Sequence, residues 1–187
     1  MAQAVQTKTA KVGLIREPVT LIPERVPSCM EFDQFGHLTP YEVIETNLST
    51  FEAVFARAFP KSQTRSGIFA EYIRYVTRLR DTVGEDFTMW VNGSFVTQKL
   101  NPRDIDFVTF LDSERYNAHE NELGELRQLR LEQGSLTDGF FVKVYPESHP
   151  NRKFYGLDRS EWLFDFGRSR TRYNTPFRNK GIIQLTF

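Results

Sequence analysis

The stretch MWVNGSFVTQKLNPRDIDFVTFLD, residues 89–112, sets two apolar segments on either side of a polar connection. Gly93 and Ser94 follow the first segment, and two aspartates, Asp104 and Asp106, stand one residue apart at the start of the second. Both apolar segments have the length and composition of buried strands. Buried carboxylates are unstable unless a cation lies against them. The question is therefore which cation these two aspartates hold.

A shared divalent cation is the simplest answer for Asp104 and Asp106. Side chains two residues apart on a strand project to the same face, so these two project together while Ile105 and Phe107 face the opposite side. Hard oxygen ligands suit Mg²⁺, which usually keeps some waters and takes phosphate oxygens as further ligands. We therefore expect a site for one or two magnesium ions, with a nucleoside triphosphate as the accompanying ligand.

Gly93 and Ser94 add a phosphate-binding element to this picture. The pattern GSFVTQKL, residues 93–100, predicts a turn followed by a short helix. A helix that begins at Gly-Ser presents backbone N–H groups to which glycine permits close approach, and its dipole favours phosphate. Nine residues separate Ser94 from Asp104, enough to bring the second strand back beside the first. The turn and the carboxylates are then expected at one edge of a sheet.

The segment VNGSFVTQKLNPRDIDFVTF, residues 91–110, resembles the signature of the nucleotidyltransferase superfamily related to DNA polymerase β. That signature is an apolar residue, Gly-Ser, a spacer of about ten residues, and then two aspartates that alternate with apolar residues. A wider resemblance, over residues 33–187, is to a group of small bacterial nucleotidyltransferase-like proteins of unassigned physiological role. The resemblance implies a small mixed sheet flanked by helices.

For the individual residues, the resemblance implies that Gly93 and Ser94 hold the triphosphate of a nucleotide such as ATP. It implies that Asp104 and Asp106 bind the metal. The activity implied is transfer of a nucleoside monophosphate to a hydroxyl group, with release of pyrophosphate.

Members of the superfamily normally carry a third carboxylate on a neighbouring strand. Asp138, at the start of the next predicted strand, is our first choice for it, and Asp165 is the second. Asp112 is rejected, because six residues of extended chain separate it from Asp106 by roughly 20 Å. Asp138 also suits a turn or a cap. The sequence therefore leaves open whether the third ligand is Asp138, Asp165 or missing.

A basic segment near the C-terminus is a further phosphate-binding candidate. Residues 167–181, GRSRTRYNTPFRNKG, contain no acid. Lys180, just before the last predicted strand, is the preferred phosphate contact. A solvated basic loop is the alternative interpretation. The other cations of the segment are Arg168, Arg170, Arg172 and Arg178. The three histidines, His37, His119 and His149, lack the spacing of metal ligands and are assigned no role.

Composition excludes several classes of protein. Lys plus Arg and Asp plus Glu both number 24, so no net positive field draws the chain to nucleic acid or to a membrane. Cys29 is the single cysteine, which excludes an intrachain disulfide. The sequence contains neither a signal-peptide pattern nor a long apolar run, so we expect a cytoplasmic protein without a membrane partner.

The chain is expected to form a partly ordered N-terminal arm, residues 1–35, with an extended piece at 18–23, and a single α+β (or α/β) domain, residues 36–187. Thr39 and Pro40 predict a helix start, and Asp158 predicts another. Helices are predicted at 38–60 in two pieces, 66–83, 113–134 and 158–167, and strands at 87–92, 104–111, 139–146 and 180–187.

Two functions of different classes follow. The first is a magnesium-dependent nucleotidyltransferase with an unidentified acceptor, which is a protein, a small molecule or an RNA end. The second is a catalytically inactive module of the same fold that binds a protein partner, for example as the antitoxin-like member of a toxin-antitoxin pair. A nucleic-acid-binding protein is disfavoured by the zero net charge.

Overall fold

The computed structural model describes residues 30–169 and 176–187, and within them a five-stranded mixed sheet forms the centre of the protein. The strand order is β3-β7-β4-β5-β6, with β3–β7 and β5–β6 parallel and the other two pairs antiparallel. A two-stranded antiparallel sheet, β1-β2, is separate from it. The strands are β1 Glu31–Phe32, β2 Leu38–Thr39, β3 Val43–Glu45, β4 Thr88–Asn92, β5 Ile105–Asp112, β6 Thr137–Val144 and β7 Ile182–Thr186.

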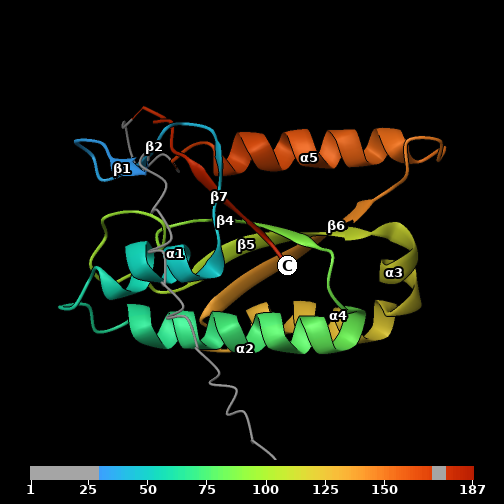
Figure 1. Ribbon diagram of the computed structural model, residues 1–187, viewed down its shortest axis with the longest axis horizontal. Helices are drawn as coiled ribbons and strands as arrows, with labels where there is room; N and C mark the ends of the chain where they lie inside the picture. Colours follow the sequence, from blue (N-terminus) through green and yellow to red (C-terminus); the bar gives the residue numbers. More distant parts are fainter. Residues whose placement is uncertain (1–29, 170–175) are drawn as a thin grey trace, which may run out of the picture.

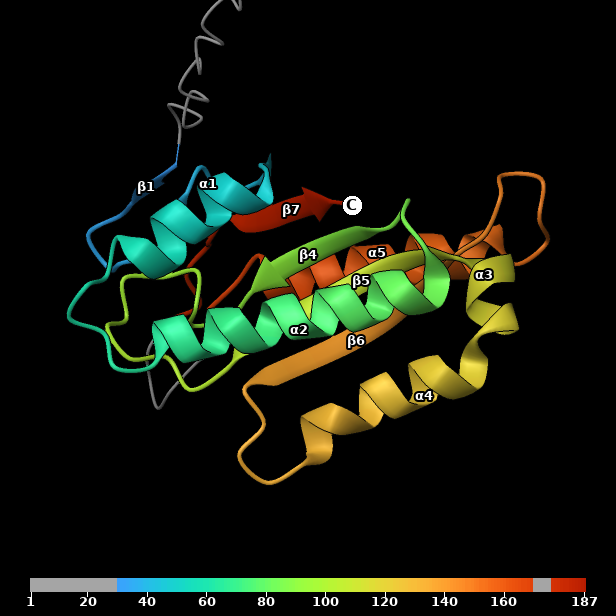
Figure 2. The ribbon, with the colours of Figure 1, turned by 60° about the horizontal axis from the view of Figure 1, so that its bottom comes forward.

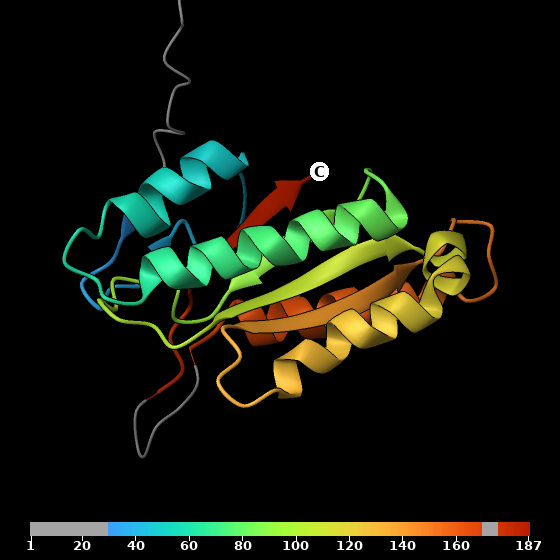
Figure 3. The same cartoon turned by 90° about the horizontal axis from the view of Figure 1, so that it is seen from below.

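Helices pack on both faces of the five-stranded sheet, which confirms the predicted α+β class. Of the described helices, α1, α2 and α4 lie on one face and α5 lies along the other (Figure 1), an arrangement that two further views repeat (Figures 2 and 3). The helices are α1 Leu48–Glu52, continued by a π-helical segment Ala53–Arg57, α2 Arg65–Val83, α3 Ser113–Ala118, α4 Glu120–Gln128, continued by a 3₁₀ turn Leu129–Leu131, and α5 Arg152–Phe166.

Alternation along β5 decides which helix its polar residue faces. Phe107 packs in the core with α2, whereas Val108 and Phe110 pack in a second buried cluster with Phe166 of α5. Since side chains two residues apart share a face, Asp106 lies on the α5 side with Val108 and Phe110. The candidate carboxylate therefore faces α5.

The strongest predicted elements are confirmed. The predicted helix 66–83 is α2, and the strands predicted at 87–92, 104–111, 139–146 and 180–187 are β4, β5, β6 and β7, each displaced by a residue or two at most. The apolar face of α2 is buried or packs against the core: Phe69, Tyr72, Ile73, Val76, Leu79 and Val83.

Thr39 does not cap a helix, and the prediction that a helix begins there is wrong. Thr39 ends β2, and β3 then pairs in parallel with β7 before α1 begins. The N-cap of α1 is Asn47, whose side-chain oxygen accepts a hydrogen bond of 2.8 Å from the backbone N–H of Thr50. Pairing with a strand nearly 140 residues away overrides the local signal of the Thr-Pro pair.

Asp158 is likewise not a cap. The helix predicted to begin there begins six residues earlier, at Arg152, and ends before Gly167 as predicted. Its first turns are held to the sheet because the Arg152 guanidinium donates to the carbonyl of Tyr145 at 2.5 Å and Tyr155 packs on the cluster beneath α5. The helix predicted over 113–134 is interrupted at His119, between α3 and α4.

Most of the predicted N-terminal arm, including residues 18–23 and Cys29, lies outside the described residues. No helix within residues 30–169 or 176–187 has both the length and the apolar character that spanning a bilayer requires.

Candidate functional site

Three polar residues form a row across neighbouring strands on the α5 face of the sheet. Asp106 of β5 pairs in register with Asp138 of β6 on one side and with Asn92 of β4 on the other. Residues paired in register project to the same face, so the two carboxylates and the amide lie side by side. The sheet thus brings the first-choice third carboxylate next to Asp106, although 31 residues of chain separate the two.

Gly93, which follows β4, lies directly against the Asp106 carboxyl. Its φ angle is +76°, a conformation that side chains other than glycine rarely adopt. A Cβ at this position would overlap the carboxylate, at 2.5 Å from its Cγ. Glycine is therefore required at position 93 for two reasons: its positive φ angle and the space that the Asp106 carboxylate occupies.

The segment after Gly93 is not a helix. Residues 93–96 form turns, and Thr97 bridges to His37, so the predicted short helix over 93–100 is wrong. The expectation that a helix dipole points at the phosphates is therefore wrong as well. The Thr97 hydroxyl donates to the carbonyl of Ser94 at 2.8 Å, which closes the turn.

Arg65, which is 1% exposed, anchors this irregular segment from within the core. Its guanidinium donates to the carbonyls of Phe95, Thr97 and Lys99 at 2.6 to 2.7 Å, and to that of Phe55 at 2.5 Å. Three carbonyls of the segment are thus bonded to one buried side chain. Burial lowers the pKa of Arg65 to about 10, so it stays charged at neutral pH. Arg65 therefore fixes the loop that follows Gly93.

Lys180 is brought to the same face from the opposite end of the domain sequence. The amide of Asn92 donates to the carbonyl of Gly181 at 2.9 Å, which ties β4 to the start of β7. The backbone N–H of Lys180 donates to the carbonyl of Gly167 at 3.0 Å, which ties it to the end of α5. Lys180 is thus held between the sheet and α5.

A pocket of about 430 Å³ opens between the carboxylate row and the C-terminal half of α5. Of the predicted site residues, it is lined by Gly93, Asp106, Asp138 and Lys180, together with the second choice, Asp165. Its other lining residues are Asn92, Phe140, Trp162, Phe164, Phe166, Arg168, Ser169 and Phe177. Acidic, basic and aromatic side chains therefore share one recess of a size usual for small-molecule sites.

Asp104 and Ser94 are the predicted residues that do not line this pocket. Asp104 is half-buried and immediately precedes β5, and Ser94 is half-buried in the turn. Of the remaining cations in the basic segment, Arg170 and Arg172 lie outside the described residues, and Arg178 packs on the ring of Phe35 at 3.4 Å from its centroid.

Asp106 and Asp138 are the candidate metal ligands of this pocket. In the described part of the chain, no three histidine, cysteine or carboxylate side chains are grouped closely enough to hold an ion by themselves. Mg²⁺ is typically bound through one or two carboxylates, with waters and substrate phosphates filling its other positions. Asp106 and Asp138, in register on neighbouring strands, supply such a pair.

Asp138 already has one cationic neighbour. The Arg130 guanidinium, from the 3₁₀ turn after α4, lies 3.7 Å from an oxygen of Asp138 and also packs over the ring of Phe140. The side chain of Asp138 remains about one third exposed, so its contact with Arg130 leaves it open to the pocket. A cation already neutralises part of the charge at this position.

Several residues that line the pocket or fix the loop beside it were not expected from the sequence. Asn92 and Arg65 have no motif of their own, because their roles depend on backbone carbonyls supplied by distant segments. Trp162 is partly buried and lines the pocket, whereas Trp90 is buried. The helix that carries Trp162 also has exposed apolar side chains, so its sequence pattern gives no signal for this position.

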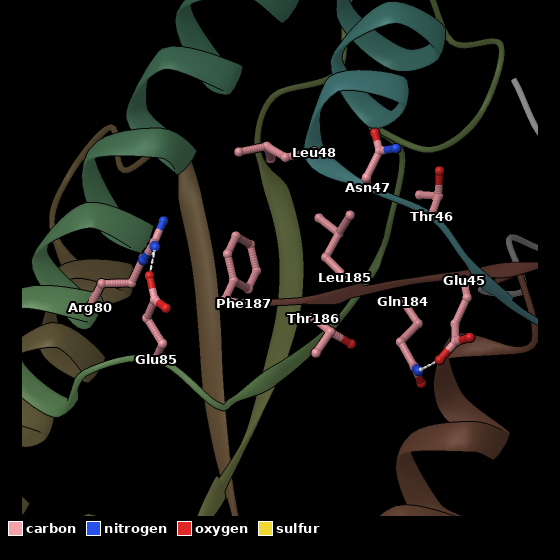
Figure 4. Close-up of a pocket in the computed structure, with 10 residues that line it drawn as sticks. All are labelled: Glu45, Thr46, Asn47, Leu48, Arg80, Glu85, Gln184, Leu185, Thr186 and Phe187. Carbon is pink, nitrogen blue, oxygen red and sulfur yellow. Dashed lines mark hydrogen bonds and ion pairs between the residues drawn. The ribbon is translucent and has the colours of Figure 1, made fainter. Parts of the chain in front are cut away.

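A larger recess of about 710 Å³ lies elsewhere, at the far end of β7 (Figure 4). It is lined by the ends of β3 and β7 and by an ion pair between Arg80 and Glu85. Within it the Gln184 amide donates to Glu45 at 2.6 Å. No residue predicted to bind metal or phosphate lines it, so the smaller pocket is the candidate site.

No significant match to the chain was found among curated proteins or among solved structures. One family model does match, and it covers residues 30–186, which include every element of the fold and the whole of the candidate site. The chain therefore belongs to DUF6932, a family of unknown function.

Proposed function

We propose that the protein is a metal-dependent nucleotidyltransferase, which moves a nucleoside monophosphate from a nucleoside triphosphate to a hydroxyl acceptor. The observation that carries the proposal is the placement of Asp106 beside Asp138, against Gly93 and in one pocket with Lys180. Carboxylates for a hard cation and a lysine for phosphate are the groups that this chemistry needs.

In the proposed reaction, the acceptor oxygen forms a bond to the α-phosphorus, and the bond from that phosphorus to the β-phosphate oxygen breaks. Pyrophosphate leaves with the electron pair, and the acceptor proton passes to a carboxylate of the row, for which Asp138 is our choice. Asp106 and Asp138 would hold the metal. The resemblance assigns Asp104 to the metal as well, but Asp104 does not line the pocket. Bound magnesium supplies charge neutralisation at the phosphates.

Lys180 and Gly93 hold the phosphates in this proposal. Lys180 is fixed by its backbone bond to Gly167, so its ammonium group is presented from a rigid segment. Gly93 lines the pocket, and its missing Cβ lets the Asp106 carboxylate lie against the backbone, so a phosphate bound by this carboxylate through a metal would lie close to the turn. Ser94 adds a hydroxyl donor in the same turn.

The test is calorimetric binding of the four nucleoside triphosphates with and without magnesium. We expect magnesium-dependent binding by the wild type, weakened by more than about tenfold in Asp106→Asn and in Asp104→Asn. Asp158→Asn removes an exposed carboxylate of α5 that lies outside the pocket, and it is expected to bind as the wild type does. Failure of the wild type to bind any triphosphate would refute the proposal.

The third carboxylate is tested separately, by comparing Asp138→Asn with Asp165→Asn. Both residues line the pocket, but Asp138 is in register with Asp106 and Asp165 is exposed on α5. We expect Asp138→Asn to abolish release of pyrophosphate from labelled nucleotide and Asp165→Asn to preserve it. The reverse result would exchange their roles.

A second candidate, an inactive module that binds a protein partner, is favoured by one observation. Arg130 lies 3.7 Å from Asp138 and supplies a positive charge where the active protein needs a metal. In this case the triphosphate binds without turnover, or does not bind. Pyrophosphate release that requires Asp106 would exclude the second candidate.

A further inference from the structure

The candidate pocket is lined by two chemically different sets of side chains. One set is charged and includes Asp106, Asp138 and Lys180, and the other consists of aromatic rings, among them rings from α5 and from the segment before β7. Two of those rings are largely exposed: Phe164 at 54% and Phe177 at 60%. Exposed aromatic rings beside a recess can bury apolar area by stacking against a flat ligand, which is favourable in free energy.

Two hydrogen bonds hold the backbone near the aromatic residues of the pocket. The N–H of Ser169 donates to the carbonyl of Arg178 at 2.8 Å, and the N–H of Arg178 donates to the hydroxyl of Ser169 at 3.1 Å. These bonds hold the segment that follows Phe177 against the residues that follow α5, the helix that carries Phe164. Both rings are therefore presented from anchored backbone rather than from independent loops.

Arg168 extends this surface. Its guanidinium lies 3.9 Å from the centroid of the Phe164 ring, and it lines the same pocket. A planar guanidinium stacks on aromatic faces and is itself a surface on which a base can stack. A flat, electron-rich heterocycle attached to a polyphosphate matches this combination of rings, cations and carboxylates.

We propose that Phe164 and Phe177 form the platform for the nucleobase, and that they make the site select purine over pyrimidine nucleoside triphosphates. This rests on the proposed function, because the triphosphate is placed at Gly93 and Lys180. Stacking on aromatic side chains accepts any base, and its strength grows with the area of the base. A purine therefore binds more tightly than a pyrimidine, with no hydrogen bond needed to read it.

The experiment uses three probes in the presence of magnesium: tripolyphosphate, ATP and CTP. Tripolyphosphate carries the phosphates without a base, so its affinity measures only the binding of metal and phosphate. We expect the wild type to bind ATP about tenfold or more tightly than tripolyphosphate, with CTP between them. Quenching of Trp162 fluorescence, from within the same pocket, gives a second readout.

The variants are Phe164→Ala and Phe177→Ala, with Phe154→Ala as the matched control. Phe154 is an equally exposed ring on α5, at 48%, but it does not line the pocket. We expect both pocket variants to lower ATP affinity toward that of tripolyphosphate and to leave tripolyphosphate binding unchanged. Phe164→Trp should restore the preference for ATP, and Phe154→Ala should change neither affinity.

The two proposals fail in different ways. If the wild type binds tripolyphosphate and ATP equally, or if Phe164→Ala and Phe177→Ala leave the preference for ATP intact, the base platform is refuted while the phosphate site stands. If no triphosphate and no tripolyphosphate binds with magnesium, the proposed function is refuted and the platform with it. Equal loss of ATP and tripolyphosphate binding in the pocket variants would also count against the platform, since it would show a general disturbance of the pocket.

Discussion

At the scale of a single residue, Gly93 is the position with the least freedom. Gly93→Ala forces a left-handed torsion on alanine, which costs about 1 to 2 kcal/mol, and places a Cβ where the Asp106 carboxylate lies. We expect a loss of stability of at least that size in urea unfolding. Because the carboxylate must move, magnesium-dependent binding of tripolyphosphate should be lost as well.

A matched glycine provides the control for that prediction. Gly156 lies in the interior of α5, and a Cβ there would meet no atom within 4 Å. Alanine at this position is expected to stabilise the protein by about 0.5 to 1 kcal/mol and to leave binding unchanged. If Gly93→Ala behaved like Gly156→Ala, the close packing of Gly93 against Asp106 would have no functional weight.

At the scale of the elements, the sequence predicted those whose pattern is strong over many residues. α2 has a continuous apolar stripe, and β5 and β6 are long apolar runs, so their existence was predictable from periodicity alone. The pairing of Asp106 with Asp138 followed less directly. It required β6 to return in parallel beside β5, which the intervening helices made plausible but did not determine.

Elements whose boundaries depend on distant partners were not predictable. Thr39 has a local helix-start signal that β-pairing overrides. Residues 93–100 form an irregular segment in which Arg65, 28 residues before Gly93, binds three carbonyls, a contact that no local pattern predicts. The aromatic lining of the pocket was missed for a similar reason. Phe164 and Phe177 meet the carboxylates only after α5 packs across the sheet.

Asp112 caps α3, so its substitution should affect the stability of the protein but not the binding of nucleotide. It lies at the end of β5 away from Gly93, and its side chain accepts hydrogen bonds from the N–H groups of Glu114 and Arg115 at 2.9 and 3.1 Å. Asp112→Ala is expected to cost about 1 kcal/mol in urea unfolding, and Asp112→Ser to recover most of it. Neither variant should change nucleotide binding, and a tenfold loss of binding would contradict the assignment.

At the scale of the whole molecule, His37 lies where three distant segments meet. It carries the bridge to Thr97, its ring nitrogen is 3.9 Å from a carboxylate oxygen of Asp33, and the charges of Lys180 and Arg178 act on it. Burial lowers the pKa of His37 below its ordinary value of 6.5, and the two cations add to this effect, while Asp33 opposes it. The folded protein therefore binds this proton less readily than the unfolded chain does.

The lowered pKa of His37 makes stability depend on pH. As the pH falls below 6.5, the unfolded chain takes up the proton before the folded protein does. The free energy of unfolding therefore decreases between pH 6.5 and the lower pKa of the folded state, and this loss is absent well above pH 6.5. His37→Gln should flatten this decline. Urea midpoints measured from about pH 5 to about pH 8 test it, and any difference that remains at about pH 8 reports packing alone, since His37 is then neutral in both states. An unchanged slope in the variant would assign the decline to other groups.

The position of β7 has a consequence for how the protein is made. β7 lies between β3 and β4 in the sheet, and the two residues just before it supply the Gly181 carbonyl that Asn92 binds and the lysine of the pocket. A nascent chain that has left the ribosome only as far as α5 therefore has two unpaired strand edges that face an empty place in the sheet. The sheet is complete only when residues 182–186 have emerged, and until then those edges expose unpaired backbone groups that can pair with another chain.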